Sequence, residues 1–339
     1  MRVALALNSL LTLVIAAAAS AALIVALKPL FARYAMARPN ARSSHTQPTP
    51  QGGGIPVVAA TIVAVLAGAA IAGTAAATTA DLWPLAAAVL LLAVTGACDD
   101  IFHLPVAPRL LAQFIAAGIV VAMLPAEARI LPLLPWWVER AVLLVVGVYA
   151  VNVVNFMDGL DWMTVAEVVP VAAGLWILSL AGALAPAETA VAIALLGANV
   201  GFAPFNRPVA KLFLGDVGSL PIGLVLFWLL LRLAANGHLA AALELPLYYV
   251  ADATITLALR LSRRENVLRA HRTHFYQRAT DRGYSVAEVV TSVFFVNVAL
   301  AFLAIVSIGR QSVAVQMSAL ALGGVAVLIV LVRFARGKR

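Results

Sequence analysis

The sequence predicts an all-α integral membrane protein with about eleven transmembrane helices. Of its 339 residues, 63% are hydrophobic and only 11% are charged, against about 45–50% and about 25% in soluble domains. Long unbroken apolar runs recur along the whole chain. A soluble protein could not bury so much apolar surface, and a disordered chain has the opposite composition. We therefore expect one integral membrane domain over residues 1–339.

Eleven apolar runs of about 20 residues each have the length that a membrane-spanning helix requires. They lie at 8–27, 55–73, 82–98, 109–125, 138–155, 164–183, 187–205, 219–236, 239–259, 287–307 and 313–332. The first run ends in Leu27-Lys28-Pro29 without a clear cleavage site. We therefore interpret it as a membrane anchor and not as a signal peptide.

The basic residues of alternate loops indicate how the helices are oriented. Eighteen Lys and Arg residues lie in one set of loops and five lie in the other. The first set comprises 28–54, 99–109, 156–163, 206–218, 260–286 and the tail after 332. Because cytoplasmic loops carry the excess of Lys and Arg, we expect this set in the cytoplasm and the N-terminus in the periplasm. The net charge of +8 thus reflects membrane topology and not nucleic-acid binding.

Two adjacent carboxylates close the third predicted span. Asp99 and Asp100 lie at its inner end, where like charges destabilise each other unless a cation lies between them. A divalent metal or a metal-bound phosphate would supply that cation. The alternative is a solvated pair at a helix end, although charges near the hydrocarbon are costly enough to suggest a function.

Amide and carboxyl side chains follow the end of the fifth span. Asn152, Asn155, Asp158 and Asp161 are three residues apart, so a helix would place them on one face. Carboxylate and amide oxygens are the ligands that Mg²⁺ prefers. The alternative is a helix-end turn, because Asp-Gly, which occurs here at 158–159, is a common turn dipeptide.

A glycine-flanked aspartate precedes the eighth span, in Lys211-Leu-Phe-Leu-Gly215-Asp216-Val-Gly218-Ser219. The glycines allow the backbone to approach an anion or a metal, and the helix start offers N–H groups to a phosphate. The Walker A pattern is absent. The alternative is an ordinary capped helix start.

The longest polar loop is rich in arginine and histidine. Seven arginines lie between residues 260 and 282; they can bind phosphates, or they only fix the orientation and contact lipid headgroups. His271 and His274 would share a face if helical and could hydrogen-bond a diphosphate. Asp252, in the preceding span, is expected to pair with Arg260 or with the site.

These segments, together with a glycine-rich one that begins at Pro48, resemble the motifs of the polyprenyl-phosphate N-acetylhexosamine-1-phosphate transferase superfamily (glycosyltransferase family 4). The superfamily includes the phospho-MurNAc-pentapeptide translocase. Five pieces match in family order within residues 48–282: Pro48 to Gly54, Asp99-Asp100, Asn155-Phe-Met-Asp158-Gly-Leu-Asp161, Phe213-Leu-Gly-Asp216-Val-Gly-Ser219 and His271-Arg-Thr-His274-Phe-Tyr-Gln277. The last piece is similar to the branch that initiates lipopolysaccharide and O-antigen synthesis.

The resemblance implies a reaction in the bacterial inner membrane. A sugar-1-phosphate, N-acetylhexosamine-1-phosphate in particular, would pass from a UDP-sugar to undecaprenyl phosphate with release of UMP. The active-site loops would face the cytoplasm. Mg²⁺ is the implied cofactor, with Mn²⁺ as an alternative, and a homodimer is an open expectation. Membrane lipid is an expected partner and nucleic acid is not.

Carried over by position, the resemblance assigns roles to individual residues. Asp216 and Asp100 would bind the metal, and Asp99, Asp100 and Asp158 would be catalytic. The implied substrate-binding residues are Asn155, Asp161, His271, Arg272, His274, Lys211 and Gly53. One position departs from the family, because Trp162 replaces the usual glycine. A bulky ring there could reshape the donor pocket.

Two rival functions are considered. A secondary transporter could use Asp99, Asp158 and Asp216 as a proton or ion relay. Transporter carboxylates, however, tend to lie near the midplane of the membrane and on internal repeats. Here the carboxylates cluster at one side, and no repeat is visible. A CDP-alcohol phosphotransferase would need an Asp-Gly-x-x-Ala-Arg signature. The sequence after Asp158-Gly159 continues differently.

Overall fold

The computed structural model describes residues 2–37, 47–266, 271–309 and 312–338. Within this part of the chain the fold is all-α, apart from one antiparallel pair of two-residue strands. Five of the basic residues counted for orientation lie outside it: Arg38, Arg42, Arg269, Arg310 and Arg339.

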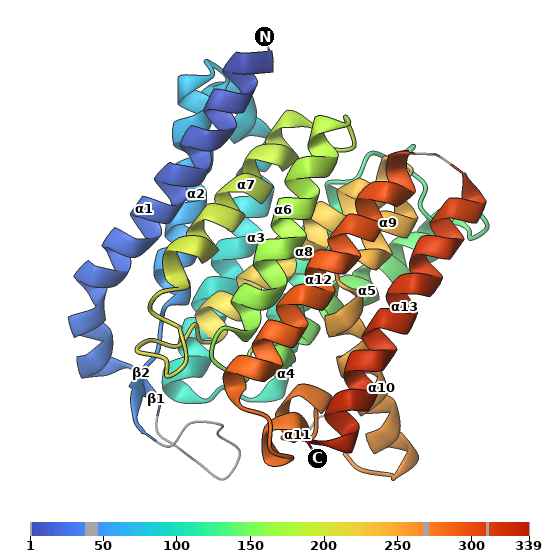
Figure 1. Cartoon of the computed structure of the whole chain (residues 1–339). Helices are drawn as coiled ribbons and strands as arrows, with labels where there is room; N and C mark the ends of the chain where they lie inside the picture. The colour runs from blue at the N-terminus through green and yellow to red at the C-terminus, as the bar shows by residue number, and fades with distance from the viewer. Residues whose placement is uncertain (1, 38–46, 267–270, 310–311, 339) are drawn as a thin grey trace.

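The helices follow the apolar runs closely (Figure 1). They are α1 (Arg2–Tyr34), α2 (Gly54–Ile71), α3 (Ala75–Phe102), α4 (Val106–Ala122), α5 (Trp136–Met157), α6 (Met163–Leu180), α7 (Pro186–Phe202), α8 (Asp216–Ala235), α9 (Leu239–Glu244), α10 (Leu247–Ser262), α11 (Phe275–Asp281), α12 (Val286–Gly309) and α13 (Val313–Arg336). The strands are β1 (Met36–Ala37) and β2 (Thr49–Pro50).

The prediction of an all-α polytopic membrane protein is confirmed. Among the described helices, eight are long and apolar enough to cross a bilayer, while α4 and α7 are apolar but have 17 residues each. The predicted single span 239–259 is wrong, because the chain breaks into α9 and α10 at Pro246. Proline lacks an N–H donor and its ring clashes with the preceding turn, so a continuous helix is unfavourable there. The total of eleven spans and their orientation stay predictions.

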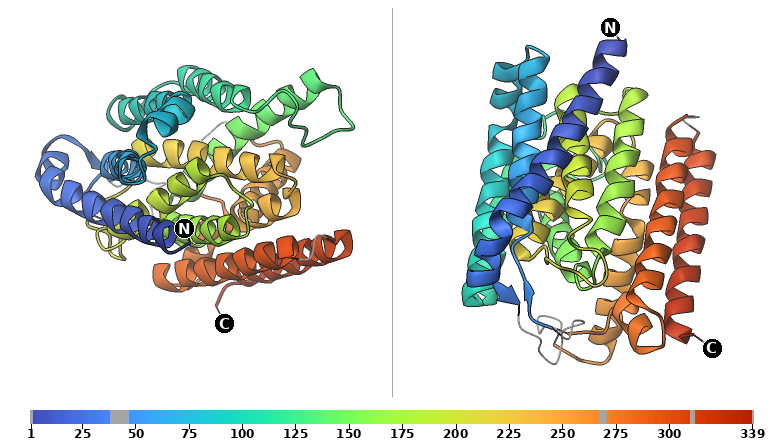
Figure 2. Two further views of the ribbon diagram at one scale, coloured as in Figure 1. Left: turned by 90° about the horizontal axis from the view of Figure 1, so that it is seen from above. Right: turned by 60° about the vertical axis from the view of Figure 1, so that its left-hand side comes forward.

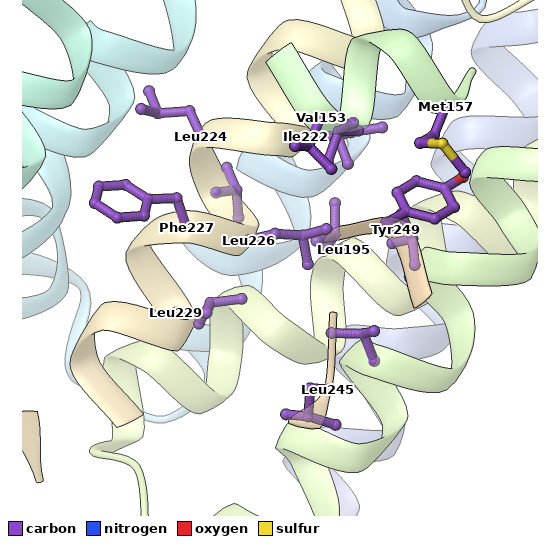
Figure 3. Close-up of a cluster of buried hydrophobic side chains, with 14 of the residues drawn as sticks. Val153, Met157, Leu195, Ile222, Leu224, Leu226, Phe227, Leu229, Leu245 and Tyr249 are labelled. Carbon is purple, nitrogen blue, oxygen red and sulfur yellow. The ribbon is translucent and has the colours of Figure 1, made fainter. Parts of the chain in front are cut away.

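The bundle is built around α8 (Figures 1 and 2). Almost all of the side chains of α8 are buried, and Figure 3 shows several of them packed with residues of α5, α7 and α10. By contrast α1 and α13 lie on the outside and expose many aliphatic side chains, as expected of lipid-facing helices. The termini lie at opposite ends of the bundle.

Glycines allow three helices to meet at one end of the bundle. A Cβ atom on Gly54 of α2 would lie well within 3.0 Å of Gly218 of α8, and one on Gly96 of α3 would lie as close to the backbone of Asp216. The loop before α2 also hydrogen-bonds the loop before α8, since Gly53 N donates to Phe213 O at 2.9 Å. A side chain at Gly54 or Gly96 would prevent these approaches. The two glycines therefore allow the end of α3 and the start of α2 to pack against the start of α8.

Candidate active site

A cavity of about 1100 Å³ opens at this end of the bundle. It is lined by segments that are far apart in the sequence: Gln51, the end of α3, Arg109 of α4, the turn after α5, the loop before α8, and Gln277 of α11. The predicted acidic residues meet here, because its wall includes Asp99, Asp100, Asp158, Asp161 and Asp216. The predicted Asn155 lines it too.

Asp100 holds the start of α8. Its carboxylate accepts the backbone N–H groups of Asp216 at 2.9 Å and Val217 at 3.1 Å, and it also accepts the side-chain amide of Gln51. A carboxylate at a helix N-terminus is favourable because it satisfies free N–H groups and complements the helix dipole. Gly215 has φ of 79°, and a Cβ there would lie 2.5 Å from Asp100 Oδ2. Glycine is therefore needed for both the backbone conformation and the contact.

Asp99 and Asp216 face a common cation, Arg109. The guanidinium forms an ion pair with Asp99, and its Nη1 lies 3.8 Å from Asp216 Oδ2. Asn155 Nδ2 donates to Asp216 Oδ1 at 2.8 Å and to Ser219 Oγ at 2.9 Å. Sequence reasoning counted Arg109 only toward orientation. The sequence feature that could have indicated its role is its position, as a single cation at the start of the span that follows the aspartate pair.

The predicted ladder on one helix face is only half correct. Asn152 and Asn155 belong to α5, but α5 ends at Met157, so Asp158 and Asp161 lie in the turn before α6. Asn152 pairs with Gln113 of α4 away from the cavity. Asp161 Oδ2 accepts Ala210 N at 2.9 Å.

The pKa of Asp158, in the turn after α5, is raised by its surroundings. Its carboxylate accepts the hydroxyl of Thr164. Burial, and then the nearby charges of Asp100 and Asp161, raise the pKa of Asp158 to about 7. Negative charge is therefore unfavourable in this part of the cavity unless a cation is bound.

Trp162 occupies a backbone conformation that favours glycine. Its φ is 65°, in the left-handed region that glycine adopts at least cost. The indole Nε1 donates to Ala203 O at 2.6 Å and the backbone N donates to Asn206 Oδ1 at 2.7 Å. The ring binds the loop after α7 and does not line the cavity, and its effect on a donor pocket stays a prediction.

The histidine-rich segment lies behind one wall of the cavity. His271 and His274 precede α11 and are not on a helix face; their rings stack with centroids 4.8 Å apart. His274, only 2% exposed, contacts Asp252 Oδ1 through Nδ1 at 3.2 Å. Burial, followed by the charges of His274 and Arg260, lowers the pKa of His271 to about 4, so this ring is uncharged at neutral pH.

Asp252 anchors α11. It is fully buried and accepts the N–H groups of Phe275 at 3.0 Å and Tyr276 at 3.1 Å. The expected partner Arg260 instead pairs with Glu265, while Arg272 pairs with Asp281 at the end of α11. In this structure His271, Arg272 and His274 do not line the cavity, and their substrate-binding roles stay predictions.

α11 contributes a residue that sequence reasoning did not assign to the site. Gln277 lines the cavity, is 7% exposed, and its Oε1 has no hydrogen-bond partner among the described residues. The preceding Tyr276 donates its hydroxyl to Phe156 O at 2.9 Å. Gly159 allows this approach, because a Cβ there would lie 2.9 Å from Gln277 Nε2 and closer still to the Tyr276 hydroxyl.

Two other predicted substrate-binding residues lie outside the cavity wall. Gly53 is buried against Phe213 and Phe202, where it joins the loops before α2 and α8. Lys211 is exposed beside the cavity, and its backbone N donates to Phe205 O at 2.9 Å. Neither lines the cavity.

The donor set fits Mg²⁺ held jointly with a substrate. Among the described residues, no group of three or more His, Cys, Asp or Glu side chains is arranged to hold a metal. Mg²⁺ usually takes one or two carboxylates and completes its shell with water and substrate phosphates. The partly exposed carboxylate of Asp216, with an amide and other carboxylates on the same wall, matches that pattern.

Comparisons with known proteins agree with the motifs. The family model for glycosyl transferase family 4 matches residues 82–234, from α3 to α8. A decaprenyl-phosphate N-acetylglucosaminephosphotransferase of Mycobacterium tuberculosis is 27% identical over 341 residues, covering 88% of this chain and 83% of that protein. The protein of that name from Mycobacterium leprae is 26% identical over 344 residues, covering 88% and 84%. A phospho-N-acetylmuramoyl-pentapeptide-transferase of Acinetobacter baylyi is 26% identical over 176 residues, covering 47% and 46%.

Proposed function

Because the chain belongs to the polyprenyl-phosphate N-acetylhexosamine-1-phosphate transferase superfamily, we propose that it transfers an N-acetylhexosamine-1-phosphate from a UDP-sugar to undecaprenyl phosphate. In this reaction an oxygen of the acceptor phosphate attacks the sugar-bearing phosphorus of the donor. A new phosphoanhydride bond forms, and the bond to UMP breaks. The motif His271-Arg-Thr-His274-Phe-Tyr-Gln277 supports the further proposal that the product initiates a lipopolysaccharide or O-antigen polymer.

The observation that carries this proposal is the convergence of five carboxylates and Arg109 on one cavity. Donor and acceptor are both anionic, so their approach requires positive charge at the reacting phosphates. Mg²⁺ would supply most of that charge when bound. Asp216 is the first proposed ligand. Asp100 is the second, and its carboxylate already accepts two backbone N–H groups and the side-chain amide of Gln51.

The cavity residues have distinct proposed tasks. Arg109 can exchange its carboxylate partners for phosphate oxygens, to which a guanidinium binds in a bidentate manner. Asp99 is proposed to act at the acceptor phosphate, and Asn155, Asp158 and Asp161 at the donor. We propose that Arg272 and His274 act by holding α11, since Arg272 pairs with its last residue and His274 shares Asp252 with its first turn.

The proposed location is the bacterial inner membrane with the cavity facing the cytoplasm. The basic loops that predict the cytoplasmic side also supply the cavity residues. A relay through the membrane is not favoured, because the carboxylates of this site lie at helix ends and in turns and not along the spans.

The test is UMP release by the purified protein. We expect release from a UDP-N-acetylhexosamine only when undecaprenyl phosphate and Mg²⁺ are both present. Asp216→Asn should abolish turnover while the thermal unfolding midpoint stays near that of the wild type. Asp81→Asn, at an exposed position near the start of α3, is the matched control and should be fully active. Normal turnover of Asp216→Asn would refute the assignment, and a panel of UDP-GlcNAc, UDP-GalNAc and deoxy-amino relatives identifies the donor.

A further inference from the structure

A second, smaller cavity lies beside α10 and α11. Its volume is about 180 Å³, and its wall includes Arg260, Arg263, Glu265, Thr273, Arg278 and Leu259. None of these residues lines the catalytic cavity. We call it the arginine cavity, because three guanidinium groups face a single carboxylate in its wall.

The carboxylate of the arginine cavity is already engaged. Glu265 pairs with Arg260 at 2.9 Å, and Arg260 also donates to Asn266 O at 2.9 Å. Arg263 and Arg278 form no ion pair with any residue that the structure describes. Arg278 instead lies over the ring of Phe275. Two guanidinium groups without an ion-pair partner among the described residues therefore lie at one small cavity.

Burial and neighbouring positive charges both act on Arg278. Burial, and then the neighbouring charges of Arg282 and Arg263, lower the pKa of Arg278. Like charges in proximity disfavour each other's ionised form. An anion in the cavity would relieve this repulsion, and a phosphate fits best, since its oxygens accept paired guanidinium N–H groups.

The surroundings of the cavity indicate where such a phosphate comes from. Leu259, which is part of the wall, is 38% exposed, and on the same helix Ile255 is 38% and Leu261 is 66% exposed. Exposed aliphatic side chains beside arginines at the end of an apolar helix are typical of the membrane interface, where lipid tails and headgroups meet. We propose that the arginine cavity binds the phosphate group of an anionic phospholipid.

The arginine cavity and the catalytic cavity share α11. Gln277 lines the catalytic cavity, while the next residue, Arg278, lines the arginine cavity. The same helix is tied to the turn after α5 by the hydrogen bond from Tyr276 to Phe156. A lipid phosphate on Arg278 thus holds one wall of the catalytic cavity in place. The binding itself does not depend on the reaction proposed above.

The test titrates the purified, detergent-solubilised full chain with phosphatidylglycerol, phosphatidylcholine or inorganic phosphate. The readouts are the thermal unfolding midpoint and the hydrogen exchange of residues 275–281. Phosphatidylglycerol should raise the midpoint saturably and slow exchange in α11. A basic residue near an anionic lipid contributes about a fivefold gain in affinity, so Arg263→Gln should weaken the response about fivefold and R263Q/R278Q about 25-fold.

The matched control removes two other arginines at the same end of the bundle. R33Q/R336Q changes the net charge equally, at exposed positions in the last turns of α1 and α13, and should shift the response less than about threefold. Arg263→Gln changes an exposed side chain that forms no ion pair with a described residue, so it should fold even if the double variant does not.

An equal loss of the response in the control variant would overturn the proposed site. An equal response to phosphatidylcholine would overturn the requirement for an anionic lipid, and an equal response to inorganic phosphate at the same concentration would overturn the lipid as the source of the phosphate. Because every readout is of binding, a failed transferase assay leaves this result unaffected.

Discussion

Adding one methyl group at Gly159 should separate α11 from the turn that carries Asp158. A Cβ at Gly159 would lie 2.9 Å from Gln277 Nε2 and closer to the Tyr276 hydroxyl, whereas non-bonded carbon atoms prefer about 3.5–4.0 Å. The Tyr276 hydroxyl must therefore move, which displaces α11 and breaks the 2.9 Å hydrogen bond from Tyr276 to Phe156. Overpacking costs about 1–3 kcal/mol and the lost hydrogen bond about 0.5–1.5 kcal/mol. Gly159→Ala should therefore lower the free energy of unfolding by about 2–4 kcal/mol.

A double-mutant cycle tests whether the Tyr276 hydroxyl is the obstacle. Tyr276→Phe alone should cost about 1 kcal/mol, since it leaves Phe156 O without that donor. In G159A/Y276F the methyl group takes the space of the hydroxyl, so the combined loss should be at least about 1 kcal/mol smaller than the sum. The assay is reversible denaturation in mixed detergent micelles, together with the donor KM. Gly324→Ala is the control, because a Cβ added at this helix position would meet no neighbouring segment within 4 Å. This variant should be neutral or slightly stabilising. Additive losses, or a Gly159→Ala variant as stable as the wild type, would refute the packing argument.

Two further predictions concern Trp162 and Gln277. Because Trp162 has φ of 65°, Trp162→Gly should be more stable than Trp162→Ala by about 1 kcal/mol in the same denaturation assay, although glycine is the smaller residue; the opposite order would contradict the strain. Gln277→Leu removes from the cavity wall an amide whose Oε1 has no hydrogen-bond partner among the described residues, and it should raise the donor KM about tenfold without loss of stability. In the same kinetic assay Gln316→Leu on α13 should change nothing, and an unchanged KM in Gln277→Leu would exclude a contact with the donor.

Most of the fold was predictable because hydropathy alone marks membrane helices. Each predicted apolar run is helical in the structure, with ends that differ by a few residues in most cases. The exceptions are local. The run 239–259 stays apolar throughout, so its hydropathy does not reveal the break at Pro246. The short helix α11 lies in a polar loop and is set by Asp252, which accepts N–H groups 23 and 24 residues later in the chain.

The candidate site was predicted in its residue types but not in its contacts. Motifs placed on one side of the membrane indicated that the aspartates would meet, and they line one cavity. The contact between Asp100 and the start of α8 joins residues 116 and 117 positions apart, and no local pattern encodes it. The same holds for Arg109, whose role depends on α3, α4 and α8 meeting. The histidines were harder to place, because their motif also serves to hold α11.

The distribution of partners among the carboxylates indicates where a divalent cation would gain most. Asp100 has two backbone N–H groups and an amide, and Asp99 has a guanidinium and a backbone N–H. Among the described residues, Asp216 accepts a side-chain hydrogen bond from the neutral amide of Asn155, and its ion pair with Arg109 is longer, at 3.8 Å. Each kind of partner stabilises a negative charge, and a full charge does so more than a neutral dipole. Of these three carboxylates, Asp216 has the weakest compensation and gains most from a cation, and it lies in the first turn of α8, the most buried of the candidate membrane spans. Asp100 therefore contributes by fixing that turn, whether or not it also binds the metal.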